Sequence, residues 1–347
     1  MGKYSIDSFE QYRLTKLRPA VMKAEKKAYR LLELSKSELE PENGELLSPP
    51  ELASETCILR LCLCSAKDAA DACGFIRRIG SFYEGGKHLA GVVMTAGKFS
   101  ATALEEIAKA YIQGFESTFL LAEPGSELME TCRKLGVQPG LWLPVSEGIL
   151  PLRRKIAENN LERVWRTKPV YIHAGRSLTP EETDAACRWH TSGADVPAEL
   201  GSSMTLRRVM FPGELTSGGV MPLRVWLQNI GTAPVYHDAK VRMELGREEE
   251  RFAISIPGFV PSPGLGDTTF NVNAQLPKLP GGTYDLWAGL EVQGKCVPLA
   301  IDAECVYGMY RIGEVTLDDT SRPYLETMWE EQYADGYYPL EDPAQPE

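Results

Sequence analysis

Polar and aromatic residues stand where several apolar runs of the chain end, and together they could bind a small ligand. His173 ends the run KPVYIH close to Arg176, and an imidazole near a guanidinium could hold a hydroxyl or a carboxylate. Trp142 could stack on the CH face of a sugar, and Lys98 and Trp189 could line the same opening. Each residue also has a structural interpretation, because buried histidines and strand tryptophans are ordinary parts of a protein core.

The elements that must position these residues alternate between strand and helix patterns from about residue 28 to 200. Within 100–115, apolar residues follow the three-and-four spacing of one helix face, at Leu104, Ile107, Ala108, Tyr111 and Ile112. Alternating strands and helices predict a parallel sheet. Seven candidate strands, with an eighth expected in the first thirty residues, favour a (β/α)₈ TIM-like barrel over an open sheet.

After about residue 204 the pattern changes to short alternating strands punctuated by proline and glycine. Such consecutive strands predict an antiparallel β-sandwich. We therefore expect a barrel over 1–203, a β-sandwich over 204–316 and an acidic, aromatic tail over 317–347.

Charge and motif content exclude several classes of partner. The net charge of -11 disfavours nucleic acids and anionic membranes. The chain shows no signal-peptide pattern and no span of bilayer length, so a cytoplasmic location is expected. The eight cysteines lack zinc-site spacing, and their apolar surroundings predict reduced thiols and no metal. No Gly-x-Gly-x-x-Gly follows a strand, and TAGKFSAT lacks the P-loop ending, so no cofactor is expected.

Two quoted stretches resemble a known family. YRLLELSKSELEPENGEL resembles the loop after an early barrel strand of bacterial beta-galactosidase-like glycosidases, and LRVWLQNIGTAPVYHDAKVRMEL is similar to a strand pair of the β-sandwich that follows such barrels. The resemblance covers nearly the whole chain except the acidic tail. It implies a saccharide ligand at the carboxyl ends of the barrel strands, on the rim that would hold the loop 37–44, Lys98, Trp142 and His173.

The resemblance also implies two catalytic carboxylates, after strands four and seven. With KHLAGVVMTAGKFSA as the fourth strand and KPVYIHA as the seventh, those positions fall near Ser100 and at His173, which cannot form a glycosyl ester. The resulting hypothesis is a pseudoenzyme that binds carbohydrate in a binding or regulatory role.

Three alternatives stay open. An active hydrolase could use displaced carboxylates, for which the candidates are Glu38, Glu40, Glu147 and Glu199. The chain could instead have a structural or assembly role, with the barrel mouth filled by side chains. A triad of Ser100, His173 and Asp195 is conceivable, but no Gly-x-Ser-x-Gly elbow supports it.

Overall fold

The computed structural model describes residues 14–17, 20–21, 26–35, 56–84, 89–95, 99–256, 264–292 and 294–328. These residues form two compact units. The α/β unit takes the described residues between Ala24 and Ser202 together with Gly231–Tyr236, and the β unit takes the rest. No helix among the described residues is long and apolar enough to cross a membrane.

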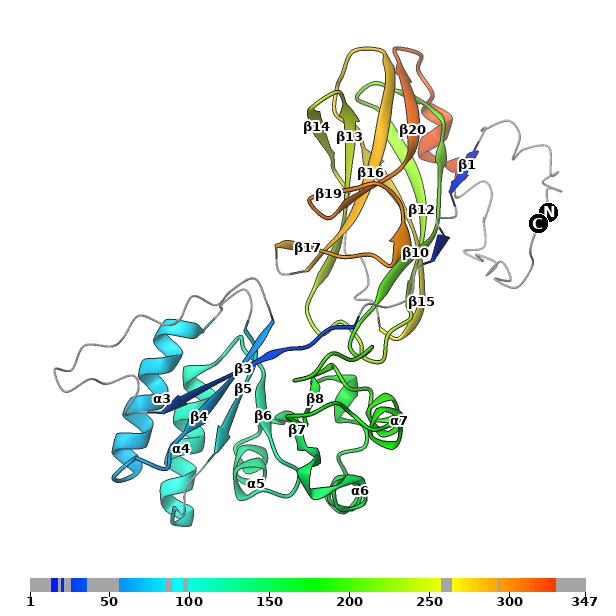
Figure 1. The fold of residues 1–347 in the computed structure, drawn as a ribbon. Helices are drawn as coiled ribbons and strands as arrows, with labels where there is room; N and C mark the ends of the chain where they lie inside the picture. The colour runs from blue at the N-terminus through cyan, green and yellow to red at the C-terminus, as the bar shows by residue number, and fades with distance from the viewer. Residues whose placement is uncertain are drawn as a thin grey trace, which may run out of the picture. The chain divides into compact units, whose positions relative to one another are not determined.

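The α/β unit is built on a parallel sheet of seven strands that follow one another in chain order (Figure 1). They are β3 (Arg30–Ser35), β4 (Cys57–Cys62), β5 (Leu89–Thr95), β6 (Leu120–Ala122), β7 (Gly140–Pro144), β8 (Val170–His173) and β9 (Gly193–Ala194). Five helices connect them, namely α3 (Ala69–Tyr83), α4 (Ala101–Gly114), α5 (Glu127–Lys134), α6 (Ile149–Glu158) and α7 (Pro180–Arg188). The predicted strand–helix alternation is confirmed.

Side-chain caps explain where most of these helices begin. Asp68, Ser100, Ser126 and Thr179 each stand one residue before a helix and accept a hydrogen bond from a backbone N–H in its first turn. Such a cap satisfies one of the N–H groups that lack a partner inside the helix. The short polar residues that follow the apolar strands therefore fix the start of the helices that return to the sheet.

The sheet curls around an inward cluster of apolar side chains. The cluster contains one buried residue from each strand between β4 and β8, together with Tyr29 just before β3; these residues are Tyr29, Ile58, Val93, Leu121, Trp142 and Tyr171. The two ends of the sheet meet, because the N–H of Tyr29 donates to the carbonyl of Ala194 at 2.9 Å and Lys27 bridges to Ala198. The interior is therefore a packed core, as in barrels of this class.

The prediction of a closed eight-stranded barrel is wrong in strand number for the described residues. The apolar pattern in the first thirty residues does form strands, β1 (Leu14–Leu17) and β2 (Ala20–Val21), but they pair with β10 and β18 of other sheets. The parallel sheet is therefore a partial, curled barrel of seven strands.

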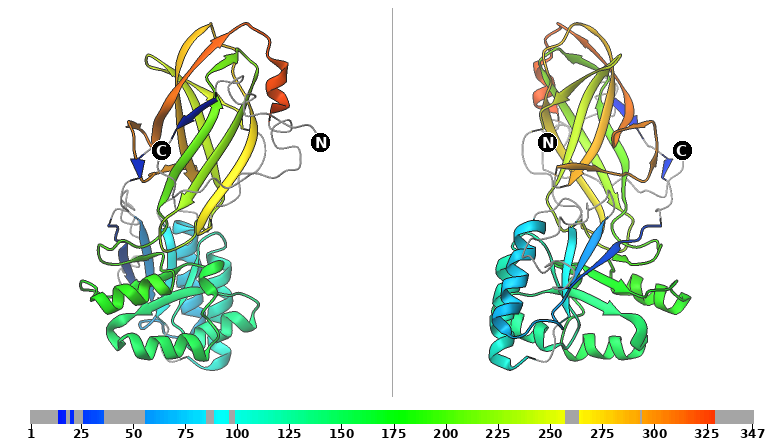
Figure 2. Two further views of the ribbon diagram at one scale, coloured as in Figure 1. Left: turned by 90° about the vertical axis from the view of Figure 1, so that its right-hand side faces the viewer. Right: turned by 60° about the vertical axis from the view of Figure 1, so that its left-hand side comes forward.

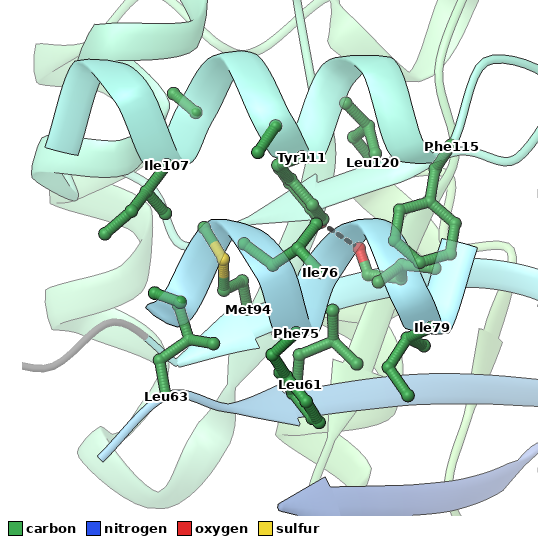
Figure 3. Packing of buried hydrophobic residues seen from close by; sticks show 14 of the residues in the cluster. Leu61, Leu63, Phe75, Ile76, Ile79, Met94, Ile107, Tyr111, Phe115 and Leu120 are labelled. Carbon is green, nitrogen blue, oxygen red and sulfur yellow. Dashed lines mark hydrogen bonds between the residues drawn. The ribbon is translucent and has the colours of Figure 1, made fainter. Parts of the chain in front are cut away.

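The helices cover the outer face of this sheet (Figure 2). Figure 3 shows the cluster that joins α3 and α4 to the first strands, in which Ile76, Ile107 and Tyr111 are fully buried. Tyr111 donates its hydroxyl to the carbonyl of Val92, so the buried phenol has a partner. A second outer cluster joins the later strands to α6 and α7. Two helix-to-sheet cores and one inward core thus hold the strands in place.

The β unit consists mainly of antiparallel strands in two sheets, as predicted for the second half of the chain. One sheet has the order β1-β10-β12-β15 and the other β11-β20-β16-β13-β14. Their strands are β10 (Met204–Pro212), β11 (Glu214–Thr216), β12 (Val220–Asn229), β13 (Ala239–Arg247), β14 (Glu250–Ile254), β15 (Gly266–Gln275), β16 (Gly282–Val292) and β20 (Met309–Asp318). Short strands β17 (Lys295–Val297), β18 (Ile301–Asp302) and β19 (Cys305–Val306) and the 3₁₀ turn Pro323–Glu326 complete the described part.

The segment Gly231–Tyr236 belongs to the α/β unit, although the sequence predicts it as part of a sandwich strand pair. The hydroxyl of Tyr236 donates to the carbonyl of Trp165 at 2.7 Å, and the hydroxyl of Thr232 donates to the carbonyl of Thr191 at 2.7 Å. These side-chain bonds to backbone carbonyls hold the segment against the α/β unit.

Candidate functional site

His173 and Asp195 form a pair at the carboxyl ends of the last two strands of the parallel sheet. Ile172 of β8 lies opposite Ala194 of β9, so the next residues of both strands emerge side by side. The Nδ1 atom of His173 lies 2.7 Å from Oδ2 of Asp195, an ion-pair distance at which the ring N–H is not aligned for a hydrogen bond. The register of two short parallel strands thus creates the pair.

Asp195 uses both of its carboxylate oxygens within the protein. Oδ1 accepts the N–H of Ala174 and Oδ2 accepts the N–H of Gly175, each at 2.8 Å. Burial would raise the pKa of Asp195, but the contact with His173 and these two N–H groups outweigh it and lower the pKa below its ordinary value. Asp195 is therefore an ionised carboxylate that orients His173 and the turn after β8.

Trp142 supports the His173 ring from the inward core. The two rings are stacked, with centroids 5.2 Å apart and planes 21° apart. Trp142 is 1% exposed and offers no free face, whereas the His173 side chain is 29% exposed. Since Nδ1 faces Asp195, Nε2 is the ring nitrogen left for a ligand.

A second polar group lies at the carboxyl ends of β3, β4 and β5. Arg60 donates from Nη1 to Oε1 of Glu33 at 2.8 Å and from Nε to Oγ1 of Thr95 at 3.0 Å. Arg60 stands two residues after the inward Ile58, and Thr95 stands two after the inward Val93. Because side chains alternate along a strand, these groups continue the inward faces above the apolar core.

The other predicted site residues lie in various places. Lys98, Glu38 and Glu40 lie outside the described residues. Glu147 ends the 3₁₀ turn Val145–Glu147 after β7, and Glu199 is exposed after β9.

Arg176 and Trp189 flank the helix α7. Arg176 forms two hydrogen bonds with Glu182, at 2.7 and 2.8 Å, and Trp189 follows the last residue of α7 and packs against the outer cluster. Of the five predicted binding residues, the structure brings together Trp142 and His173.

The strands expected as the fourth and seventh of the barrel are the third and sixth strands of the described sheet. In the described sheet, the fourth strand is β6, followed by Glu123, and the seventh is β9, followed by Asp195. The segments expected as fourth and seventh strands are β5 and β8, the third and sixth. Ser100, the expected stand-in for a catalytic carboxylate, caps α4 by accepting the N–H of Ala103 at 3.3 Å.

A hollow of about 250 Å³ opens at the amino ends of the strands, where the two ends of the sheet meet. Lys27, Thr56, Ser192 and Gly193 are among the residues that line it. Its wall includes Tyr29 and Tyr171, which belong to the inward core beneath His173. The hollow and the His173–Asp195 pair therefore lie at different ends of the strands. Among the described residues, no cluster of three or more metal-ligating side chains occurs.

Comparison with known proteins gives distant structural matches only. No family model and no curated protein matches this chain. A mutant beta-glucosidase from Listeria innocua in complex with laminaribiose is 11% identical, with a TM-score of 0.26 over 91% of this chain and 50% of that chain. A protein assigned as an alpha-L-fucosidase from Bacteroides thetaiotaomicron is 8% identical, with a TM-score of 0.25 over 75% of this chain and 74% of that chain.

The CARDB domain of the PF1109 protein from Pyrococcus furiosus is also similar in part. It is 15% identical, with a TM-score of 0.21 over 34% of this chain and 89% of that chain. This chain spans 40% of the Listeria beta-glucosidase in complex with glucose. Matches at these TM-scores establish no shared family and no shared activity.

Proposed function

We propose that the carboxyl end of the partial barrel binds a neutral saccharide without cleaving it. The observation that carries this proposal is the fixed His173 ring. Asp195 orients one edge and Trp142 supports one face, while Nε2 has no partner among the described residues. A pre-oriented polar group above an apolar floor is what a small-molecule site needs, since little ordering is left to be done on binding.

The charges at this end favour a neutral ligand. Arg60 is paired with Glu33, and His173 stands beside Asp195, so both of these groups have an anionic neighbour. These pairs and Thr95 present fixed donors and acceptors with little net charge. Hydroxyl groups of a sugar can donate and accept in such a site without leaving a buried charge unpaired.

The same pairing argues against the covalent route of a retaining glycosidase. That route needs a carboxylate nucleophile and a second carboxyl group about 5 Å apart, each free to face the sugar. Asp195 is 9% exposed and already receives two backbone N–H groups, and Glu33 receives Arg60. A binding or regulatory role therefore fits these residues better.

A second candidate function is hydrolysis by Glu123 and Asp195. It is favoured by one observation: these carboxylates follow the fourth and seventh strands, where the sequence resemblance places a catalytic pair. Glu123 is exposed, which suits an acid or base that meets substrate.

The test is to titrate the full chain with a panel of neutral mono- and disaccharides and to measure binding by calorimetry. We expect one or more sugars to bind, and His173→Gln to weaken that binding about tenfold or more, as loss of an oriented hydrogen bond does. His190→Gln is the matched control, because His190 also lies against a tryptophan, with its ring centroid 3.7 Å from that of Trp165 and the planes tilted by 34°, and its Nδ1 lies 3.1 Å from the carbonyl of Thr232. No binding, or equal losses in both variants, would reject the saccharide site and favour an assembly role.

Turnover of nitrophenyl glycosides separates the two candidate functions. The binding proposal predicts no turnover by the wild type. If the wild type hydrolyses a glycoside and both Glu123→Gln and Asp195→Asn abolish that activity, the binding proposal is rejected in favour of hydrolysis by these two carboxylates.

A further inference from the structure

An indole N–H without an acceptor is buried on the β unit, on the face of the second sheet that lies opposite its core. Trp287 of β16 is 2% exposed, and its Nε1 has no hydrogen-bond partner among the residues that the structure describes. Its neighbours Leu286 and Ala288 are core residues, so the alternation of the strand turns Trp287 to the other face. Buried N–H groups are nearly always paired, so this one is a donor that a bound acceptor could satisfy.

Arg251 of β14 covers the indole. Its guanidinium carbon lies 3.8 Å from the centre of the Trp287 ring, which is a cation–π contact. No carboxylate pairs with Arg251 among the described residues, whereas the nearby Arg311 is paired with Asp285 and Glu314. Arg251 is thus a cation of this face without an ion-pair partner among the described residues.

Gly246 of β13 makes room for this arrangement. Gly246 lies opposite Arg251 in the sheet, and a Cβ atom there would stand 1.9 Å from Nη1 of Arg251 and 2.8 Å from Nε1 of Trp287. Both donors therefore lie directly over the backbone of Gly246, and neither has an acceptor among the described residues. Two adjacent donors, one of them cationic, suit a carboxylate oxygen.

We propose that this face binds an acidic saccharide, with the carboxylate of a uronic-type sugar held by Arg251 and Nε1 of Trp287. The sugar ring takes the place of the guanidinium over the indole, because the CH face of a pyranose stacks on tryptophan. Arg251 is exposed and lies on an edge strand, so it can swing aside and keep its charge near the carboxylate. Glu244, which lies opposite Trp287 and is paired with Arg242, is available to accept a sugar hydroxyl.

The experiment uses the full chain labelled with ¹⁵N and titrated with a galacturonic acid trisaccharide. The chain has six tryptophans, and Trp287→Phe identifies the indole N–H signal of Trp287. We expect that signal to shift on titration. The dissociation constant should rise about tenfold or more in Arg251→Gln, and to a similar degree in Gly246→Val, whose side chain would collide with both donors and displace them. A neutral galactose trisaccharide should bind at least about tenfold more weakly.

Two matched controls come from the same unit. The Nε1 of Trp226 already donates to Asp267 at 2.8 Å, and Arg247 lies over the ring of Tyr284 at 5.6 Å. Trp226→Phe and Arg247→Gln should therefore leave binding unchanged. Absence of binding, equal binding of the neutral sugar, or full affinity in Arg251→Gln would overturn the proposal.

His173→Gln should leave this site intact, since the acidic-sugar site uses residues of the β unit only. Failure of one site thus remains distinguishable from failure of the other. A variant that loses acidic-sugar binding through Arg251→Gln should still bind the neutral ligand of the barrel.

Discussion

The indole of Trp142 lies almost parallel to the imidazole of His173, with ring centroids 5.2 Å apart. Trp142 also belongs to the inward core with Tyr29, at a ring separation of 6.0 Å, so one side chain joins the core to the candidate site. Large-to-small changes at buried aromatic positions cost about 3–5 kcal/mol. We expect Trp142→Ala to destabilise the α/β unit by about that amount in urea unfolding. Phe82→Ala, at a position 50% exposed, should change stability by less than about 0.5 kcal/mol.

The pairing of Asp195 gives a pH-dependent contribution to stability. The pKa of Asp195 is lowered from 3.8 in the folded state, so the unfolded chain binds the proton more tightly. Its contribution is therefore present above about pH 4 and is lost as pH falls through the folded pKa. We expect Asp195→Asn to be less stable than wild type at pH 7, and the gap to narrow at pH 3. Urea unfolding at both pH values measures this, and a gap of the same size at both would contradict the role of the charge.

Local patterns in the sequence predict the strand–helix alternation but not which strands pair. The three-and-four spacing within 100–115 predicts α4, because the apolar face of a helix depends only on residues close in sequence. Leu14 pairs with Pro212, nearly two hundred residues later, and no local pattern specifies that partner. This long-range choice removes β1 from the barrel and shifts the strand count by one.

The candidate site was predictable only in part, because one of its residues follows from a local pattern and the other from strand pairing. His173 is identifiable because it ends an apolar run, but its partner Asp195 depends on the register between β8 and β9. β9 has only two residues, which are too few for the alternation of a strand to be recognised in the sequence. The carboxylate partner of Arg60 is Glu33, which lies directly opposite on the neighbouring strand. Leu31 packs against the inward core, and because side chains alternate along a strand, Glu33 two residues later lies on the same face as Arg60.

The start of α7 combines a capping box with an ion pair at Glu182. Its carboxylate receives two hydrogen bonds from Arg176, and these, helped by Thr179 and opposed by burial, lower the pKa of Glu182 to about 2. Glu182→Gln should destabilise the α/β unit by about 1 kcal/mol at pH 7 in urea unfolding, within the range for a lost cap. The difference should shrink as pH falls below about 4, where the unfolded carboxylate protonates. Glu181→Gln, at an exposed position of the same turn, should have little effect.

Gly80 of α3 lies directly against the backbone of Gly114, the last residue of α4. A Cβ atom at Gly80 would stand 2.3 Å from the carbonyl oxygen of Gly114 and 2.9 Å from its carbonyl carbon, and backbone atoms cannot turn aside as a side chain can. Gly80→Ala should therefore push the helices apart over the buried cluster in Figure 3 and destabilise the α/β unit by about 1–3 kcal/mol. Gly74, on the same helix, has no atom within 4 Å of its Cβ position, so Gly74→Ala should stabilise by up to about 1 kcal/mol through helix propensity. Urea unfolding of the two variants beside wild type checks both signs. A neutral or stabilising Gly80→Ala would show that the helix pair can separate without loss and that the cluster does not fix their distance.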